Sequence, residues 1–273
     1  MVIRKHRLEG DGVKFVESPN HGGLFDRGLP DAIIIHYTAG SSAESSVKTL
    51  CDPRTKASAH LVIGRKGSIT QLVMFNKMAW HAGKSSFGGR SGFNKYSIGI
   101  EIDNAGRLTK NPGGYTAWFG NTYPESDVVE AVHRNESTQS FWHRYTEEQV
   151  NLVLDICIDL VGEYGISTIL GHEEISPGRK VDPGPAFPLD KLRERVLQRD
   201  RSHEGPAEDL PIHDAGMVTA SKLNIRSAPR LDAATVAPPL AQGTVVDILQ
   251  EAHGWYEVEV TTRGWVKKEY IRI

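Results

Sequence analysis

The stretch from Gly171 to Pro188, which reads GHEEISPGRKVDPGPAFP, restricts the fold more than any other part of the chain. It contains four prolines and three glycines. Each proline fixes its own φ and removes a backbone N–H donor, which excludes a helix or a central strand across the stretch. We therefore expect an irregular loop whose shape is set by its own stiff residues. Ligating and catalytic side chains collect in such loops when a rigid scaffold holds them.

Three side chains of this loop have metal or charge chemistry, namely those of His172, Lys180 and Asp182. Histidine and aspartate are good zinc ligands, and a lysine is a point charge that can stabilise a developing oxyanion. On composition alone, a proline-rich surface connection with solvated charges explains the stretch equally well. The choice between the two interpretations depends on a partner elsewhere in the chain.

The candidate partner is His36, which ends the short apolar run DAIIIHYT that begins at Asp31. Consecutive β-branched residues without alternation predict a strand buried on both faces. A residue at the end of such a strand lies at the rim of the sheet, where the sites of α/β folds collect. A lone histidine there is more often a satisfied core histidine than a ligand, and its separation from His172 matches no metal-binding motif. Spacing alone does not establish a zinc site.

A second candidate lies in the segment Ser97 to Asp103, which reads SIGIEID and alternates strictly. The three isoleucines share one face of the expected strand, so Glu101 lies on the opposite face with Gly99 and Asp103. A carboxylate in mid-strand is unfavourable unless it is paired or faces an open cleft. Glu101 is therefore a candidate functional residue, whereas Asp103, nearer the strand end, is interpreted as structural.

Other aromatic and histidine side chains have two interpretations each. His60 begins an expected strand, so it lies either beside the site or at an ordinary strand end. Trp80 and His81 combine an aromatic plane with a hydrogen-bonding ring, which suits a sugar or a peptide. A buried tryptophan that anchors a loop explains the pair equally well.

Residues 105–145 are rich in glycine and aromatic side chains and have no clear period. We expect an irregular segment, and compact domains seldom carry one this long unless it is functional. The functional interpretation is one wall of a cleft, with Trp118 or Trp142 stacking on a substrate. The alternative is an insertion packed on the side of the domain.

Regular elements fill most of the remaining chain. Capping residues and apolar periodicity predict the helices, and β-branched runs between turn residues predict the strands. The expected helices run to about residue 52 from a cap at 41–44, from 146 to 165 and from 189 to 200, and the expected strands are 31–36, 60–63, 68–73, 97–103 and 166–170.

The spacing of His36 and His172 identifies no known site, but five segments of the sequence resemble the motifs of a known family. They are IIIHYTAG, SAHLVIGRKGSITQLV, AWHAGKSSFGGR, SIGIEIDNAG and GHEEISPGRKVDPGPAF. In this order, from about residue 30 to 195, they resemble the successive motifs of the zinc-dependent N-acetylmuramoyl-L-alanine amidases of the type 2 family. That family includes amidases that degrade or recycle peptidoglycan, T7 lysozyme and the peptidoglycan recognition proteins. The resemblance implies an α/β catalytic domain, residues 1–200, with a central mixed sheet flanked by helices.

The resemblance also implies a role for each site residue. His36, His172 and Asp182 would hold one Zn²⁺ per chain, although some family members carry cysteine where this chain has Asp182. Glu101 would be the general base that activates the attacking water, and Lys180 would stabilise the oxyanion. The bond cut would be the amide between the lactyl group of N-acetylmuramic acid and L-alanine of the stem peptide. The residues expected to bind substrate are Tyr37, His60, Trp80, His81 and Asn94.

The last part of the chain has a different composition and a different pattern of expected elements. Residues 201–215 are polar with two prolines, which is typical of a linker, and short expected strands between turns then recur to the end. The motifs LNIRSAP, GWYEV and GWVKKEYI resemble a bacterial SH3 domain over residues 216–273, a small all-β barrel. Such domains often bind cell-wall peptide. Trp255 and Trp265 are equally well explained as core residues or as ligand contacts.

Composition excludes several other classes. The net charge of −2 provides no basic field for nucleic acid, and no apolar run is long enough to span a membrane. Two cysteines cannot build a disulfide framework, and we expect Cys51 and Cys157 to be buried thiols. The charged start, MVIRKHRLEGDG, lacks the apolar region of a signal peptide. We expect the chain to be cytoplasmic as synthesised, and its route to the wall, by lysis or by a non-Sec pathway, stays open.

Three rival functions remain beside the hydrolase. A non-catalytic recognition module would keep the fold and lose a ligand, but all of the motif's ligands are present. A zinc peptidase would cut within the stem peptide, which analysis of the products distinguishes. A regulatory partner role like that of T7 lysozyme has no support in the sequence. Whether the substrate is intact wall or anhydro-muropeptide stays open.

Overall fold

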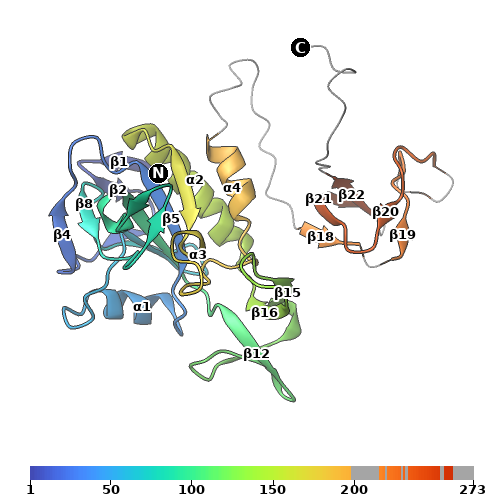
Figure 1. The fold of residues 1–273 in the computed structure, drawn as a ribbon, viewed down its shortest axis with the longest axis horizontal. Coiled ribbons are helices and arrows are strands. Elements are labelled where there is room, and N and C mark those ends of the chain that lie inside the picture. The colour runs from blue at the N-terminus through green and yellow to red at the C-terminus, as the bar shows by residue number, and fades with distance from the viewer. Residues whose placement is uncertain (198–214, 219, 229, 231–232, 253–254, 261–273) are drawn as a thin grey trace, which may run out of the picture. The chain divides into compact units, whose positions relative to one another are not determined.

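The computed structural model describes residues 1–197, 215–218, 220–228, 230, 233–252 and 255–260. The chain divides into two compact units, Met1–Ala207 and Glu208–Ile273 (Figure 1). The expected linker up to residue 214 and Trp265 lie outside the described residues.

A six-stranded mixed sheet is the centre of the first unit, in the order β17-β5-β11-β6-β7-β3. Strands β17, β5, β11 and β6 are parallel, β6 and β7 form the predicted antiparallel hairpin, and β3 is parallel to β7. The mixed sheet and its helices confirm the predicted fold class. The bounds are β3 (Val13–Phe15), β5 (Ala32–Tyr37), β6 (Leu61–Ile63), β7 (Ile69–Gln71), β11 (Ser97–Ile102) and β17 (Thr168–Gly171).

Burial along β5 and β11 explains why they occupy the middle of the sheet. The residues of β5 from Ala32 to His36 are all buried, as its unbroken apolar sequence predicts. The three isoleucines of β11 are fully buried on one face, which leaves the opposite face for Gly99 and Glu101. His36 and Glu101 therefore both lie near the carboxyl ends of their strands.

Helices cover the sheet. Helix α1 packs on β6 with Ser42 as its N-cap, and α2 begins with the predicted capping box of Thr146 and Gln149 and ends at Gly165 in the left-handed conformation. Helices α2 and α4 pack against each other. Cys157 is fully buried in α2, as expected, whereas Cys51, which follows α1, is half-buried. The helices are α1 (Ala43–Leu50), α2 (Glu147–Tyr164), α3 (His172–Ile175) and α4 (Leu189–Leu197), with 3-10 turns η1 (Phe93–Lys95) and η2 (Glu125–Asp127).

Among the described residues of the first unit, three two-stranded ribbons lie outside the central sheet. The first is formed by the chain's start, and the second joins the N-terminal region to the strand before Trp80. The third lies in the glycine-rich segment before η1. They pair β1 (Val2–Arg4) with β2 (Arg7–Glu9), β4 (His21–Leu24) with β8 (Lys77–Ala79), and β9 (Ser86–Phe87) with β10 (Arg90–Ser91).

The segment 105–145 is not irregular, and this prediction was wrong. It forms a five-stranded antiparallel sheet in the order β14-β13-β12-β16-β15, which we call the insertion sheet (Figure 1). Its strands are too short, and joined by too many turn residues, for a period of two to stand out in the sequence. The bounds are β12 (Arg107–Asn111), β13 (Gly114–Thr116), β14 (Thr122–Tyr123), β15 (Val128–Val132) and β16 (Gln139–His143).

The proline-rich stretch also differs from expectation at its start. Residues His172–Ile175 form the short helix α3, and the irregular loop begins only after Ser176. The helix fits because the first proline of the stretch is Pro177, so nothing in the first turn lacks a backbone N–H donor. His172 is therefore held at a helix start rather than in a loop.

The described residues of the second unit are all-β. They contain a three-stranded antiparallel sheet, a two-stranded ribbon and one isolated bridge. Trp255 is half-buried at the start of β22, between core and surface. The strands are β18 (Ala215–Met217), β19 (Lys222–Leu223), β20 (Leu240–Ala241), β21 (Val245–Ala252) and β22 (Trp255–Glu259).

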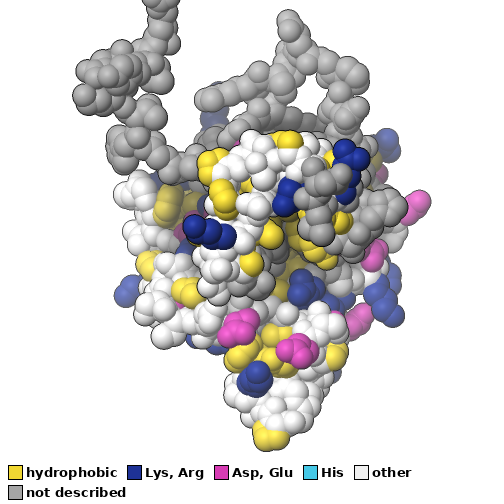
Figure 2. All heavy atoms as spheres, turned by 90° about the vertical axis from the view of Figure 1, so that its right-hand side faces the viewer, with side chains coloured by type: hydrophobic (Ala, Val, Ile, Leu, Met, Phe, Trp, Pro, Cys, Tyr) yellow, Lys and Arg dark blue, Asp and Glu magenta, His cyan; other side chains and the backbone are white. Residues whose placement is uncertain are grey.

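The face drawn in Figure 2 carries no dominant charge among the described residues. On this face, basic and acidic side chains of the described residues are interspersed with apolar ones. This agrees with the net charge of −2. None of the helices in the described part of the chain has the length and apolar character that crossing a bilayer requires.

Candidate active site

The parallel strands β17, β5 and β11 bring the candidate residues to one edge of the sheet. His36 on β5 is the register partner of Glu101 on β11, and Ile35 is the partner of Gly171 on β17. Residues in register on neighbouring strands lie about 4.8 Å apart and share a face. Residue His172 follows Gly171 directly, so three residues distant in sequence meet at the carboxyl ends of three adjacent strands.

Three donor atoms converge at this edge. Nδ1 of His36 lies 2.9 Å from Nδ1 of His172 and 2.9 Å from Oδ2 of Asp182. Nδ1 of His172 lies 3.0 Å from the same carboxylate oxygen. All three side chains are buried, with 1% of His36, 3% of His172 and 6% of Asp182 exposed. The proline-stiffened loop therefore does bring Asp182 back onto the end of β5.

A chain of hydrogen bonds determines which nitrogen of His36 is free. The hydroxyl of Ser97 donates to the carbonyl of Phe93, so this hydroxyl and the Ser97 carbonyl can only accept from Nε2–H of His81, 3.3 and 3.2 Å away. Nδ1 of His81 then carries no proton and accepts from Nε2–H of His36 at 2.9 Å. Nδ1 of His36 is consequently a lone pair that faces the cluster.

The same reasoning applies to His172. Its Nε2 atom lies 3.1 Å from the carbonyl oxygen of Ala82, which can only accept a hydrogen bond. Nδ1 of His172 is therefore also a lone pair. Together with the Asp182 carboxylate, three lone pairs point at one another with no proton between them. Such an arrangement needs a cation.

The electrostatics of the site agree with a cation. Burial and the neighbouring His172 lower the pKa of His36 to about 4, so its imidazole is neutral at physiological pH, as a metal ligand must be. Burial alone would raise the pKa of Asp182. Contact with His172 and His36 outweighs the burial and holds this pKa well below its usual range, so the carboxylate is ionised.

Glu101 has the surroundings of an acid–base group. Burial, followed by the nearby Asp182 charge, raises its pKa well above the usual value, while the charge of Lys180 acts in the opposite direction. Its Oε2 atom is buried and has no hydrogen-bond partner among the described residues. An unpartnered buried carboxylate oxygen is costly and indicates a missing partner such as a water or an ion. Lys180 is half-buried and lies close enough to affect the pKa of both Glu101 and His36.

The residues present fit a divalent metal. Two imidazole nitrogens and one carboxylate oxygen form a common catalytic ligand set for zinc, which binds them at about 2.0–2.2 Å and keeps a fourth position open. Tetrahedral coordination at that length separates the donors by about 3.3 Å. The observed 2.9–3.0 Å separations require only a small outward movement. Among the described residues, this is the group of histidine and acidic side chains that could hold a metal ion.

Two of the expected substrate-binding histidines are buried within the fold. His60 is completely buried, and its ring accepts from the Gly99 amide and contacts the Lys77 carbonyl. His81 is 9% exposed and is engaged by His36 and Ser97 as described above. Both rings therefore support the site from behind.

The remaining expected substrate-binding residues are partly accessible. Tyr37 and Trp80 are half-buried, and Tyr37 lines the cavity discussed below. Asn94 is also half-buried, and its side-chain oxygen accepts from the amides of His81 and Ala82 at 3.1 and 2.7 Å. Asn94 thus holds the segment that orients both histidine ligands.

Sequence reasoning missed a buried ion-pair network behind the ligands. Oε2 of Glu173 accepts from Nε2 of His133 at 2.8 Å and from the Gly184 amide at 2.9 Å, while Oε1 accepts from Arg134 at 2.8 Å. The Glu173 amide donates to the Asp182 carbonyl at 2.8 Å. The insertion sheet therefore clamps the two segments that carry His172 and Asp182. In the sequence, the only sign of this network is that Glu173 directly follows the candidate ligand His172.

The two tryptophans of the insertion sheet segment differ in exposure. Trp142 is 1% exposed and packs between Arg107 and Gly184, so of the two tryptophans expected as alternatives to stack on a substrate, this one is excluded. It is buried because it closes the contact between the insertion sheet and the ligand loop. Trp118 is 79% exposed.

Fold and site together define a class of protein, an α/β domain with a buried two-histidine, one-aspartate cluster that could hold a metal, beside a half-buried glutamate. The model of the N-acetylmuramoyl-L-alanine amidase family matches residues 26–185, and that of the bacterial SH3 domain matches residues 221–272. The chain belongs to the N-acetylmuramoyl-L-alanine amidase family, since the match covers more than half of it.

Relatives and a solved structure agree with this family. The chain is 29% identical over 203 residues to 1,6-anhydro-N-acetylmuramyl-L-alanine amidase AmpD of Escherichia coli, covering 68% of this chain and 92% of AmpD. It is 28% identical over 174 residues to N-acetylmuramoyl-L-alanine amidase AmiD of the same organism, covering 60% of this chain but only 52% of AmiD. The crystal structure of a selenomethionine derivative of AmpD matches with a TM-score of 0.51 at 26% identity, covering 72% of this chain and 99% of AmpD.

Proposed function

We propose that the chain hydrolyses the amide between the lactyl group of N-acetylmuramic acid and L-alanine of the peptidoglycan stem peptide, using one bound Zn²⁺. The observation that carries the proposal is the convergence of three unprotonated donor atoms of His36, His172 and Asp182 within 3.0 Å of one another. Family membership supports the same reaction, because AmpD and AmiD are both named for cleavage of the muramyl–L-alanine amide. The chain spans only about half of AmiD, so the substrate belongs to the proposal.

His36, His172 and Asp182 would hold the ion. A zinc ion bound there acts as a Lewis acid that polarises the scissile carbonyl and acidifies water. The chain's own contribution is to orient both imidazoles and to keep that of His36 neutral. The acceptors His81 and the Ala82 carbonyl perform this orientation.

Glu101 is assigned as the general base. It takes a proton from the attacking water and returns it to the leaving amine of L-alanine. A general base is most effective when its pKa lies near the working pH, and burial shifts that of Glu101 in this direction. Because Glu101 and His36 are register partners on adjacent strands, the base lies beside the ligand cluster.

Lys180 is assigned to the oxyanion. The tetrahedral intermediate of amide hydrolysis concentrates negative charge on the former carbonyl oxygen, and a fixed cation there stabilises it. Lys180 lies two residues before Asp182, and its backbone amide donates to the Ser176 carbonyl at 3.0 Å. This bond ties its position to the end of α3.

The second unit is assigned the role of attaching the chain to the cell wall. Bacterial SH3 domains bind peptides through a small barrel, and the family match at residues 221–272 supports a contact with cell-wall peptide. Fold alone does not determine the ligand, so binding to purified sacculi is the relevant measurement.

The test is digestion of purified sacculi and of a soluble muramoyl tripeptide by the zinc-loaded chain. Mass spectrometry should find stem peptides with a free L-alanine amino group, and chelation should abolish their release. Cleavage at any bond within the stem peptide would replace the amidase with a peptidase. Binding of sacculi without any release would make the chain a recognition module.

A further inference from the structure

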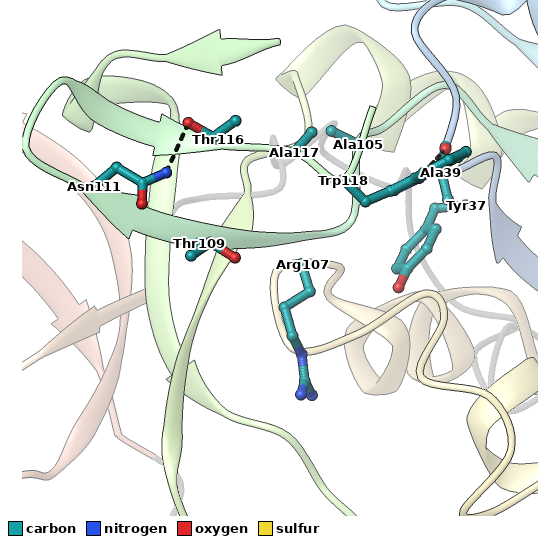
Figure 3. A pocket seen from close by; sticks show the side chains of 9 residues that line it. All are labelled: Tyr37, Ala39, Ala105, Arg107, Thr109, Asn111, Thr116, Ala117 and Trp118. Atoms are coloured by element: carbon teal, nitrogen blue, oxygen red, sulfur yellow. Dashed lines mark hydrogen bonds between the residues drawn. The ribbon is translucent and has the colours of Figure 1, made fainter. Parts of the chain in front are cut away.

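A cavity of about 390 Å³ lies between the end of β5 and the insertion sheet, and neither the metal cluster nor the general base lines it. Sites for small organic molecules begin at about this size. Figure 3 shows its walls, which come from the loop after β5, from β12 and from the segment that follows β13. The side chains that matter below are those of Tyr37, Arg107, Thr109, Asn111 and Trp118.

The polar wall of the cavity follows from the alternation of β12. Arg107, Thr109 and Asn111 are two residues apart, so they share one face of the strand, and all three line the cavity. Leu108 faces the other way into the apolar core of the insertion sheet. The insertion sheet thus has one face that makes its core and a second, polar face that borders a cavity.

Trp118 supplies the aromatic wall. Its side chain is 79% exposed, yet its Nε1–H donates to the carbonyl of Ala39 at 2.8 Å. This bond fixes the indole plane while leaving much of its surface open (Figure 3). An exposed aromatic plane held next to polar groups offers a surface on which an amphipathic ring can stack.

Two residues of the cavity wall connect it with the candidate active site. Tyr37 lines it and directly follows the ligand His36 on β5. Arg107 also lines it and lies 4.6 Å above the Trp142 ring, which in turn packs on Gly184 in the loop of the ligand Asp182. The cavity therefore lies beside the two segments that carry His36 and Asp182.

The charge balance of the cavity indicates a neutral ligand. Arg107 is the cation in its lining, and its guanidinium already pairs with the two carboxylate oxygens of Glu136 at 2.6 and 2.7 Å. Asn111 donates to the Thr116 hydroxyl at 3.1 Å, which leaves the Asn111 carbonyl oxygen as an acceptor. The hydroxyl of Thr109 makes no hydrogen bond to any of the described residues. Neutral amide and hydroxyl groups suit sugar hydroxyls better than the carboxylates of a stem peptide.

We propose that this cavity binds a pyranose ring of the glycan strand adjacent to the muramoyl residue whose amide is cut. One face of a pyranose presents C–H groups, which pack on the negative face of the indole of Trp118. Its hydroxyl groups reach Thr109 and Asn111 on the adjoining wall. The inference rests on the proposed amidase activity and deepens it. It makes the insertion sheet a determinant of specificity for glycan-linked substrate over single muramoyl peptides.

The test compares two soluble substrates with the zinc-loaded full chain. One is N-acetylmuramoyl-L-alanyl-D-isoglutamine, and the other carries the same dipeptide on the central sugar of a trisaccharide flanked by N-acetylglucosamine. The trisaccharide should be cleaved with about tenfold higher kcat/KM, the gain expected from one stacked ring. Trp118→Ala should remove this advantage while leaving cleavage of the single muramoyl peptide unchanged.

Two control variants define the site. Trp118→Phe keeps an aromatic plane and should retain most of the preference, and Thr109→Val should reduce it by removing one hydroxyl without changing shape. Lys110→Ala alters the opposite face of the same strand and should change neither substrate. Equal losses on both substrates in Trp118→Ala, or an advantage from lengthening the peptide instead of the glycan, would overturn the proposal.

A binding measurement separates this proposal from the amidase assignment. In the ¹⁵N-labelled full chain, the indole N–H signal of Trp118, assigned by its loss in Trp118→Phe, should shift on titration with the trisaccharide in the Glu101→Gln variant. The single muramoyl peptide should not shift it. If neither substrate is cleaved yet this shift occurs, the saccharide site stands and the amidase assignment fails. An unshifted signal removes the saccharide site whatever the catalytic result.

Discussion

Nε2 of His36 lies 2.9 Å from Nδ1 of His81, and this bond sets the proton position on a candidate metal ligand. His81 can accept there only because its own Nε2–H donates to the Ser97 carbonyl. A residue expected to face the substrate thus supports the cluster from behind. Orienting acceptors of this kind are typically worth 10- to 100-fold in metal affinity.

His81→Phe should accordingly bind Zn²⁺ about 10- to 100-fold more weakly, because Nε2–H of His36 loses its acceptor. His81→Asn places an amide oxygen near the lost Nδ1 atom and should recover part of the affinity. Competition with a chromophoric chelator measures both variants. Unaltered zinc affinity in His81→Phe would show that the His36 tautomer is set by something else.

Gly99 provides the space that His81 occupies. A Cβ atom added at this position on β11 would lie 2.3 Å from Cγ of His81. Gly99→Ala should therefore destabilise the fold by about 1–3 kcal/mol through overpacking and weaken zinc binding by displacing the ring. Urea denaturation and the chelator assay report the two effects.

The matched control for Gly99→Ala is Gly162→Ala in α2, where an added Cβ would meet nothing within 4 Å. This change should raise stability by about 0.5–1 kcal/mol, because glycine is unfavourable within a helix. If the two alanine variants were equally stable, the steric account of Gly99 would be incorrect.

Glu101 predicts how stability depends on pH in the metal-free protein. Burial raises its folded-state pKa above the unfolded value of 4.5, so the folded state holds the proton more tightly than the unfolded state. The stability contributed by protonated Glu101 is complete below that value. It is lost as the pH rises through the folded-state pKa.

Glu101→Gln removes this titration. The free energy of unfolding of the variant should therefore exceed that of the wild type by an amount that grows as the pH rises above 4.5. With zinc bound, the same variant should retain the metal and lose about 10²- to 10⁴-fold in kcat as the base is removed. A pH-independent difference in stability would exclude an unpartnered carboxyl at this position, and full turnover would remove Glu101 as the base.

The sequence predicted the parts of the site that depend on strands and failed where distant segments pack. Unbroken β-branched residues identified β5, and alternation identified the polar face that carries Glu101. The meeting of His36 with Asp182 came from resemblance, because no spacing rule relates a strand end to a loop. The supporting role of His81 was invisible, since burial of a histidine is set by its neighbours. The strands of the insertion sheet were missed because each is too short for its alternation to stand out in the sequence.

The two-unit organisation predicts separable activities. All of the cluster and base residues lie in the unit Met1–Ala207, which has its own core. A chain ending at residue 207 should cleave the soluble muramoyl peptide with a kcat/KM within about twofold of the full chain, as expected for an independent domain. Its retention on purified sacculi in a sedimentation assay should fall. Retention equal to that of the full chain would assign the second unit to another purpose.

Glu173 predicts a link between the insertion sheet and the metal ligands. Its carboxylate is 2% exposed and satisfies His133, Arg134 and the Gly184 amide. Glu173→Ala leaves the buried His133 ring and the Gly184 amide without this acceptor, so stability should fall by about 3 kcal/mol in urea denaturation. Glu136→Ala breaks the more exposed pair with Arg107 and should cost less than about 1 kcal/mol.

Loss of the Glu173 carboxylate should also weaken zinc binding. Because the Glu173 amide holds the Asp182 carbonyl and the carboxylate holds the Gly184 amide, the loop carrying Asp182 loses one of its two hydrogen bonds to Glu173. Zinc affinity should fall by about tenfold or more in Glu173→Ala. The double variant with His133→Ala should cost less stability than the two single changes together, since they remove one shared interaction. Additive losses would mean that the insertion sheet and the ligand loop are not coupled through this pair.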